Sequence, residues 1–218
     1  MNQNGKQFDA NTKIAITAMA CSALLFLLAA LSTNANSIIE IEQQILSVVA
    51  ESSNPWLDVF FNWATLLGDF NVMCPIVIVS AAVLLYKHQF KVTGVLCVSF
   101  FGAALTTTLL KIMFDRPRPD LFDSALTYLP SNAAFPSGHT THATALALCL
   151  TWLAFRQRHY FLLVVASIIA TLVATSRIYL QVHWPTDLLG GLAVSLFWVS
   201  FAVLITDYFP RSVNRTAR

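Results

Sequence analysis

Residues 92–113 read VTGVLCVSFFGAALTTTLLKIM, an apolar stretch whose single charged residue, Lys111, stands near its end. A helix needs about 20 mostly apolar residues to cross the hydrocarbon core of a bilayer. Helices suit that environment because lipid cannot hydrogen-bond to exposed backbone groups. The stretch therefore predicts a membrane-spanning helix, with which the rest of the chain can be compared.

The same pattern recurs along the chain, which has 56% hydrophobic and 11% charged residues and a mean hydropathy of +0.65. Ordinary soluble domains carry roughly 25% charged residues. The other apolar stretches are 14–32, 70–86, 140–155, 160–178 and 188–207. Because no internal repeat or linker divides residues 1–218, we expect a single all-α domain, a bundle of six membrane-spanning helices.

Basic residues gather in alternate connections between these stretches. They are Lys6, Lys13, Lys87, Lys91, Arg156, Arg158, Arg211, Arg215 and Arg218. Cytoplasmic loops carry an excess of Lys and Arg, so we expect these segments and both chain ends on the cytoplasmic side. Residues 33–69, 114–139 and 179–187 then face outward. The apolar run of 14–32 is longer than a typical signal-peptide core, which favours an uncleaved anchor over a cleaved signal.

An amphipathic segment follows the first stretch. Residues 37–50 place Ile38, Ile41, Ile45, Val48 and Val49 at helical spacing, with Glu40, Glu42 and Gln43 between them. This pattern predicts a helix on the outer membrane surface. Trp56, Phe60, Phe61 and Trp63 add an aromatic cluster typical of the headgroup level. We expect a short interfacial helical hairpin that anchors the chain or guides a lipid.

Three cations stand close together where the 92–113 stretch ends: Lys111, Arg116 and Arg118. One cation would be explained by a side chain that reaches the interface. Three on the outward side indicate an anion, because arginine offers a planar fork to phosphate oxygens and lysine a point charge. Pro117 and Pro119 stop the helix, so Arg118 lies on a stiff extended segment.

A second polar cluster, Pro136-Ser137-Gly138-His139, directly precedes the 140–155 stretch. A turn of small residues at a helix start presents free backbone amides and the positive end of the helix dipole, which together can hold an anion. Ser137 can equally be interpreted as a plain helix cap. His139 could be an interface histidine, and we interpret His142 as a packing neighbour.

The third cluster contains Ser176 and Arg177, followed by His183 and Asp187. Pro185 suits the first turn of a helix. Asp187 would then lie one turn from His183, where it could hold one imidazole nitrogen and leave the other free. An orienting carboxylate makes histidine a better nucleophile or base. Ionisable residues at a membrane span indicate a functional site.

Together the clusters contain the groups that phosphoryl transfer needs, because its transition state spreads negative charge over oxygens that positioned donors can hold. Lys111, Arg118 and Arg177 would bind those oxygens, helped by Ser137 and the Gly138 amide. His183 would attack phosphorus, and His139 would protonate the departing oxygen and then activate water.

Lys-x6-Arg-Pro at 111–119, Pro-Ser-Gly-His at 136–139 and Ser-Arg-x5-His-x3-Asp at 176–187 resemble, at every signature position, the three motifs of the type 2 phosphatidic acid phosphatase superfamily. The resemblance implies a metal-independent phosphatase without a cofactor, in the bacterial inner membrane with its site on the outer face. Its substrate would be phosphatidylglycerol phosphate, undecaprenyl diphosphate, phosphatidate or lipid A. The implied roles are phosphate binding by Lys111, Arg118, Ser137, Gly138 and Arg177, acid catalysis by His139, nucleophilic attack by His183 and orientation by Asp187.

Other interpretations use fewer of these residues. A serine hydrolase built from Ser137, His183 and Asp187 would have no use for three cations. A haloperoxidase of the same superfamily would be soluble, and a lipid-phosphate carrier or flippase would not need the pair of His183 and Asp187. A lipid phosphotransferase of the same family stays open.

Two further expectations concern partners and neighbouring residues. The net charge of +2 comes mostly from the inside loops and the polar clusters, so nothing indicates a nucleic-acid partner. A metal site would have to use Asp115, Asp120 and Asp123. Arg116 lies outside the matched motifs, and we therefore expect its loss to matter far less than the loss of Arg118.

Overall fold

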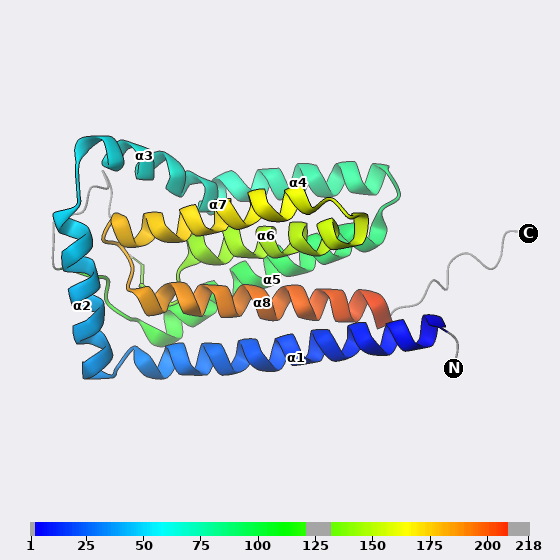
Figure 1. The fold of residues 1–218 in the computed structure, drawn as a ribbon, viewed down its shortest axis with the longest axis horizontal. Helices are drawn as coiled ribbons and strands as arrows, with labels where there is room; N and C mark the ends of the chain where they lie inside the picture. The colour runs from blue at the N-terminus through cyan, green and yellow to red at the C-terminus, as the bar shows by residue number, and fades with distance from the viewer. Residues whose placement is uncertain (1–2, 121–131, 209–218) are drawn as a thin grey trace, which may run out of the picture.

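The computed structural model describes residues 3–120 and 132–208, and every regular element within these ranges is helical. The elements are α1 (Gln3–Ser32), α2 (Asn36–Glu51), α3 (Pro55–Thr65), the 3-10 helix η1 (Leu66–Gly68), α4 (Phe70–Tyr86), α5 (Phe90–Phe114), α6 (Gly138–Gln157), α7 (Tyr160–Tyr179) and α8 (Pro185–Tyr208) (Figure 1). The all-α class predicted from the sequence is confirmed for this part of the chain.

Helices α1, α4, α5, α6, α7 and α8 run side by side, and α2 crosses one end of the bundle (Figure 1). Successive long helices reverse direction, so that α1 begins and α8 ends at the opposite end from α2. The last turns of α5 and α7 and the first turns of α6 and α8 therefore meet near α2. These are the turns that carry the three polar clusters of the sequence.

Four helices in the described ranges are long and apolar enough to cross a membrane: Asn11–Ser32, Phe90–Phe114, Tyr160–Tyr179 and Pro185–Asp207. Pro55–Gly68 and Phe70–Tyr86 qualify together as a pair bent by 44°, which would make a fifth span. Length and composition thus give four or five spans where the sequence analysis expected six. The remaining helix of the bundle, α6, does not qualify.

Helix α6 is the centre of the bundle, because α4, α5, α7 and α8 all pack against it. Thr140, Thr141 and Thr144 on this helix are buried. Thr141 accepts a hydrogen bond from Thr107 of α5 (3.2 Å) at its hydroxyl and one from Ser195 of α8 (2.8 Å) at its carbonyl. A helix that is covered by other helices needs no apolar stripe toward lipid, which explains its low hydropathy.

The start of α6 lies very close to α8. A Cβ atom on Gly191 of α8 would lie 2.8 Å from the carbonyl oxygen of Ser137, so a side chain cannot fit there. The backbone N–H of Ser137 also donates to the carbonyl oxygen of Asp187 at 3.0 Å. These contacts fix the second polar cluster of the sequence against the third.

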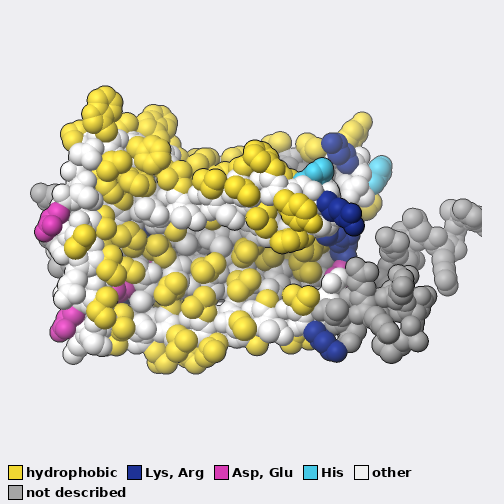
Figure 2. Space-filling view, in the orientation of Figure 1, with side chains coloured by type: hydrophobic (Ala, Val, Ile, Leu, Met, Phe, Trp, Pro, Cys, Tyr) yellow, Lys and Arg dark blue, Asp and Glu magenta, His cyan; other side chains and the backbone are white. Residues whose placement is uncertain are grey.

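On the face shown in Figure 2, charged side chains lie toward the two ends of the bundle, and hydrophobic side chains cover the length between them. The connection between α4 and α5 carries Lys87, and that between α6 and α7 carries Arg158, both at the end where α1 begins. Acidic side chains appear at the α2 end in this view. Of the other basic residues in the charge argument, Arg211, Arg215, Arg218 and the side chain of Lys6 lie outside the described part.

Helix α2 has the expected position in the sequence and two different long faces. Ile41, Ile45 and Val48 form an exposed apolar stripe, whereas Glu42 and Leu46 are buried against the bundle. The burial of Glu42 differs from the expected surface helix, in which this residue belonged to the polar, solvated face. The buried charge of Glu42 is tolerated because a cationic side chain pairs with it inside the protein.

The aromatic segment after α2 forms α3. Trp56, Phe60 and Trp63 are exposed, as expected for residues at a membrane interface. Phe61 instead packs on the ring of Tyr179 at the end of α7, with ring centroids 4.3 Å apart. The segment is thereby tied to the helix that carries the third polar cluster.

Candidate active site

A cavity of about 690 Å³ opens among α4, α5, α6 and α7, next to the connection between α7 and α8. Six of the eight site residues predicted from the sequence line it: Lys111, Arg118, Gly138, His139, Arg177 and His183. They come from segments up to 72 residues apart in the chain, between Lys111 and His183. The apolar part of its wall consists of Phe70, Phe101, Ala104, Leu105 and Ile112.

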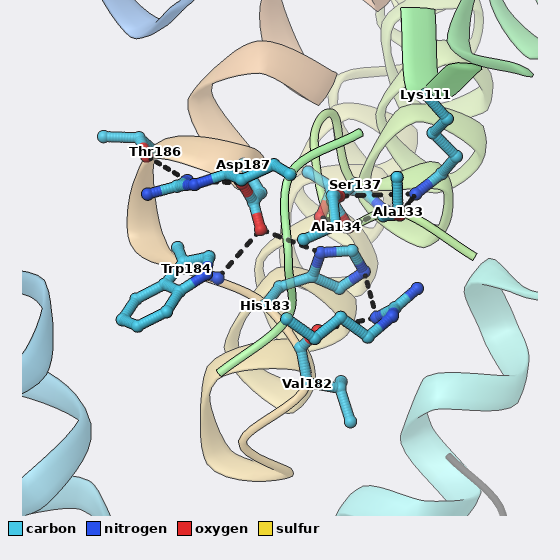
Figure 3. Close-up of polar contacts among 12 residues, drawn as sticks. Lys111, Ala133, Ala134, Ser137, Val182, His183, Trp184, Thr186 and Asp187 are labelled. Atoms are coloured by element: carbon cyan, nitrogen blue, oxygen red, sulfur yellow. Dashed lines mark hydrogen bonds and ion pairs between the residues drawn. The ribbon is translucent and has the colours of Figure 1, made fainter. Parts of the chain in front are cut away.

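His183 and Asp187 form the pair that the sequence predicts, and Figure 3 shows the two side chains pointing toward each other. The Nδ1 atom of His183 lies 3.1 Å from the Oδ2 atom of Asp187. Asp187 has no exposed surface, and its Oδ2 atom also accepts from the backbone N–H of Trp184 at 2.9 Å. The carboxylate therefore holds the proton of the imidazole on Nδ1.

The other ring nitrogen of His183 meets a cation. Nη1 of Arg118 lies 3.2 Å from Nε2 of His183 and donates to the carbonyl oxygen of Val182 at 2.6 Å. With the proton on Nδ1, Nε2 is the acceptor of this contact and keeps its lone pair. Nε2 is therefore the ring nitrogen that can act as a nucleophile.

The electrostatics of this pair favour a neutral imidazole. Burial is the main reason that the pKa of His183 lies well below its usual value of 6.5. The cations Arg118, Arg177 and Lys111 lower this pKa further, because they oppose a second positive charge. Burial also lowers the pKa of Arg118, and the nearby Asp187 partly offsets that effect.

The other two predicted cations have few anionic neighbours. The ammonium group of Lys111 donates to the carbonyl oxygens of Ala133 and of Ala134, the latter at 3.3 Å. Arg177 is almost completely buried and donates from Nη1 to Thr65 at 2.5 Å. Its Nε atom has no hydrogen-bond partner among the described residues. A buried donor without a partner is costly, so this nitrogen fits an oxyanion bound in the cavity.

The start of α6 agrees only in part with the prediction. Gly138 and His139 line the cavity, but Ser137 is fully buried and does not. The Ser137 hydroxyl accepts from the backbone N–H of Thr140 at 3.4 Å, which is the geometry of a helix cap. The alternative interpretation of Ser137 as a cap therefore describes its contacts here, and a phosphate role for it remains a prediction.

Asp69, Asn132 and His142 are among the cavity residues that the sequence did not predict as site residues. Asp69, in the bend before α4, places Oδ2 3.8 Å from Nε2 of His139. Asn132 accepts from Arg118 at its side-chain oxygen (2.6 Å) and its carbonyl (2.9 Å). His142 contacts the Gly68 carbonyl at 3.0 Å and the rings of two phenylalanines, so its packing role is combined with a place in the wall. None of these residues carries a sequence signal beyond its polarity.

Arg116 has a position that the sequence did not indicate. It is buried, and it bonds to Asp187 rather than lining the cavity (Nη1 to Oδ1, 2.6 Å). Its other terminal nitrogen bonds to Glu42 at 2.7 Å. We expected the loss of Arg116 to matter far less than the loss of Arg118, because Arg116 lies outside the matched motifs. Its bond to Asp187 means that its position in the sequence no longer supports this expectation.

The described ranges contain no group of three or more His, Cys, Asp or Glu side chains placed to hold a metal ion. Asp115 and Asp120 of the possible metal set are within these ranges, whereas Asp123 lies outside them. The cysteines Cys21, Cys74, Cys97 and Cys149 are all free. The donors around the cavity are cations and imidazoles, which suit an anionic group.

Comparison with known proteins shows the family of this chain. The model of the PAP2 superfamily matches residues 93–211, a range that includes all three motifs. Phosphatidylglycerophosphatase B of Bacillus subtilis is 32% identical over 181 residues, which cover 79% of this chain and 87% of that protein. Lipid A 4'-phosphatase of Porphyromonas gingivalis is 33% identical over 183 residues, covering 78% of this chain and 75% of the other.

Solved structures share the helix arrangement. The crystal structure of a transmembrane PAP2 type phosphatidylglycerolphosphate phosphatase from Bacillus subtilis superposes with a TM-score of 0.80 at 25% identity, covering 89% of this chain and 98% of that one. The structure of Aquifex aeolicus LpxE shares the fold with a TM-score of 0.60, over 73% and 93% of the two chains. From the matched region, the relatives and the shared fold, it follows that this chain belongs to the PAP2 superfamily.

Proposed function

We propose that the chain is a phosphatase that removes phosphate from a membrane lipid carrying a phosphate or diphosphate group. The observation that carries this proposal is the position of His183, in a cavity with cations on one part of its wall and apolar side chains on another. Cations fit the phosphate, and the apolar wall fits the first part of a lipid tail. The names of the relatives agree with such a substrate.

The first chemical step is an in-line attack. Nε2 of His183 bonds to phosphorus while the bond from phosphorus to the lipid oxygen breaks. Lys111, Arg118 and Arg177 hold the charge on the equatorial oxygens. His139 gives its proton to the departing oxygen, and the negative phosphate favours the protonated form that this step needs.

The second step returns the enzyme to its starting state. Water attacks the phosphohistidine from the side that the lipid has left, and His139, now neutral, takes a proton from the water. The N–P bond breaks and inorganic phosphate leaves. His183 regains its lone pair on Nε2, while Asp187 keeps the other ring nitrogen protonated throughout.

The lipid tail has a route from the bilayer between α4 and α5. Leu105 and Ile112 on α5 line the cavity and are 62% and 75% exposed, so they also face the surroundings of the bundle. Phe70 of α4 lines the cavity from the other side of this route. We propose that the headgroup reaches the cations while the tail stays in lipid.

For the membrane we propose six spans: α1, α4, α5, α6, α7 and α8, with α6 shielded by its neighbours. The basic end then lies in the cytoplasm, by the excess of Lys and Arg in cytoplasmic loops. Both chain ends share that side, and the cavity opens toward the outer face of a bacterial inner membrane. Helices α2 and α3 form the interfacial hairpin of this arrangement.

The test is phosphate release by purified protein from a panel of lipids: phosphatidylglycerol phosphate, undecaprenyl diphosphate, phosphatidate and lipid A. We expect turnover of at least one lipid by the wild type and none by His183→Gln. A lipid phosphotransferase would instead pass the phosphate to an added acceptor lipid with no release into water. Binding of lipid phosphate without either reaction would indicate a carrier and would refute the proposal.

Metal independence is tested in the same assay. Because three cations surround the phosphate position, we expect activity to persist after treatment with EDTA and to be blocked by vanadate, which can occupy a phosphate pocket in five-coordinate form. Loss of activity in EDTA with recovery in Mg²⁺ would contradict this and would direct attention to Asp115, Asp120 and Asp123.

A further inference from the structure

We propose that Glu42 and Arg116 are positioning residues for the reaction, linked to His183 through Asp187 in one buried ion chain. The proposal rests on the function proposed above, in which His183 is the nucleophile. Neither residue occupies a signature position of the three motifs, and Glu42 belongs to a surface helix that precedes them by more than one span.

The inner part of the ion chain joins Arg116 to the orienting carboxylate. Oδ2 of Asp187 contacts His183, and Oδ1 accepts from Nη1 of Arg116 at 2.6 Å. Asp187 is fully buried and Arg116 is 7% exposed. With its two oxygens held from different sides, the carboxylate cannot rotate, and the direction of the bond to the imidazole is fixed.

The outer part joins Arg116 to α2. Nη2 of Arg116 donates to Oε2 of Glu42 at 2.7 Å, and the Glu42 side chain is 2% exposed. One guanidinium thus bridges two buried carboxylates through separate nitrogens. Arginine can do this because its donors form a rigid planar fork, which the ammonium group of lysine does not provide.

Thr186 closes the chain of contacts into a ring. Its backbone N–H and its hydroxyl both donate to Oε1 of Glu42, at 2.8 and 2.6 Å, and its hydroxyl accepts from Arg116 at 2.8 Å. Thr186 directly precedes Asp187 in the first turn of α8. Glu42 therefore holds the start of α8 both through Arg116 and directly.

Trp184 covers this ring. The guanidinium carbon of Arg116 lies 5.3 Å from the centre of the Trp184 ring, within the range of a cation–π contact. The indole N–H donates to the carbonyl oxygen of Pro117 at 2.9 Å. The cover keeps water from the ion pairs, and shielded ion pairs retain more of their attraction than exposed ones.

The charges explain why both residues are needed. Without Glu42, the guanidinium of Arg116 would have Asp187 as its single anionic partner and would draw charge away from the oxygen that faces His183. Without Arg116, two buried carboxylates would be left close together, which is strongly unfavourable. Glu42 and Arg116 thus place Asp187 and leave it enough negative charge to hold the imidazole.

The experiment compares two glutamates on the same helix. Glu42→Gln removes the charge from the ion chain, whereas Glu40→Gln makes the same change at an exposed position two residues earlier. We expect kcat for lipid phosphate to fall roughly 10- to 100-fold in Glu42→Gln, the range typical of outer-shell partners, and to stay at the wild-type level in Glu40→Gln. The phosphate-binding cations are intact in both, so KM and the inhibition constant for vanadate should not change.

Arg116 is tested by two replacements. Arg116→Lys keeps one charge but cannot bridge both carboxylates, and we expect a loss of kcat comparable to that of Glu42→Gln. The second replacement is Arg116→Met, made alone and together with Glu42→Gln. The double variant removes one charge of each sign, and it should lose much less than the product of the losses in Glu42→Gln alone and Arg116→Met alone. Protection of each variant by vanadate against thermal unfolding shows that its site is formed.

The outcomes separate the two proposals. If the wild type hydrolyses lipid phosphate and Glu42→Gln has the kcat of Glu40→Gln, the ion chain has no positioning role and the proposed function stands. If Glu42→Gln lowers kcat, raises KM and weakens vanadate binding together, its role is generally structural. That result would also overturn the inference. A wild type that hydrolyses none of the lipids removes the proposed function, and the inference with it.

Discussion

At the level of single residues, both ring nitrogens of His183 are engaged, one by a carboxylate and the other by a guanidinium. In the proposed reaction, Arg118 lies where phosphorus approaches Nε2 of His183. A phosphate oxygen offers this guanidinium a charged partner in place of a neutral ring nitrogen, and charged hydrogen bonds are the stronger kind. Substrate binding should therefore move Arg118 onto the phosphate and free the nucleophile at the same time.

The first residue-level prediction concerns the nucleophile and its partner. His183→Gln removes the attacking nitrogen, so phosphate release should fall below a few per cent of the wild-type rate. Asp187→Asn should be less severe, because the nucleophile stays and only its orientation and tautomer are weakened. Rates of phosphate release, measured beside vanadate-protected melting, check both. A His183→Gln protein with substantial turnover would exclude a phosphohistidine.

The second residue-level prediction concerns protonation. Since burial and three cations hold the pKa of His183 well below 6.5, its ring should be neutral at pH 6.5 in the empty enzyme and should gain a proton only in more acidic solution. NMR of ¹⁵N-labelled histidine in detergent, with His183→Gln for assignment, measures this directly. An imidazolium signal from His183 at pH 7 would show that burial and the cations do not lower its pKa.

At the level of helices, the wall between α4 and α5 combines the inside of the cavity with the outside of the bundle. Leu105 belongs to both surfaces. In the proposed route a long-chain lipid passes this wall, whereas a small soluble ester can reach the cations without it. The two kinds of substrate should therefore respond differently to a change on α5.

Leu105→Trp is expected to lower kcat/KM for a long-chain lipid phosphate several-fold by filling the route, with little effect on p-nitrophenyl phosphate. Leu109→Trp is the matched control, because Leu109 is exposed on the same helix and does not line the cavity. Both substrates are compared in the same detergent. Equal effects of the two tryptophans, or equal loss for both substrates, would place the lipid route elsewhere.

The helices themselves were largely predictable, since long apolar stretches have few alternatives in a membrane. The α6 stretch was located correctly, but its classification as a membrane-spanning helix is not supported by length and hydropathy alone. In the site, the motif spacing predicted the pair of His183 and Asp187 and six of the residues that line the cavity. Glu42 and Arg116 were missed because their contacts join residues 74 positions apart, which spacing along the chain does not reveal.

At the level of the whole molecule, charge is divided between the two ends of the bundle (Figure 2). The active-site cations are an exception, because they lie in a cavity near the end opposite the basic loops. An excess of Lys and Arg in loops sets the orientation in which the protein inserts into the membrane, whereas cations within a cavity bind a ligand. The two groups of positive residues therefore have separate physical roles.

This separation gives a prediction for topology. A fluorescent protein joined after Arg218 should fold and fluoresce in bacterial cells, because the chain end is expected in the cytoplasm. Alkaline phosphatase, which is active only outside the cytoplasm, should be active when joined after Leu180, at the end of α7. A dark fluorescent-protein fusion after Arg218, together with an inactive alkaline phosphatase fusion after Leu180, would reverse the orientation.

Helix α2 also has a consequence for attempts to simplify the protein. Its exposed stripe of Ile41, Ile45 and Val48 is typical of an amphipathic membrane anchor, which could be deleted or exchanged for another amphipathic peptide. Yet one turn of the same helix supplies the counterion of Arg116. Under the proposed positioning role, membrane attachment and support of Asp187 are not separate modules. A substitute amphipathic peptide would keep the attachment and would leave Arg116 without its Glu42 counterion.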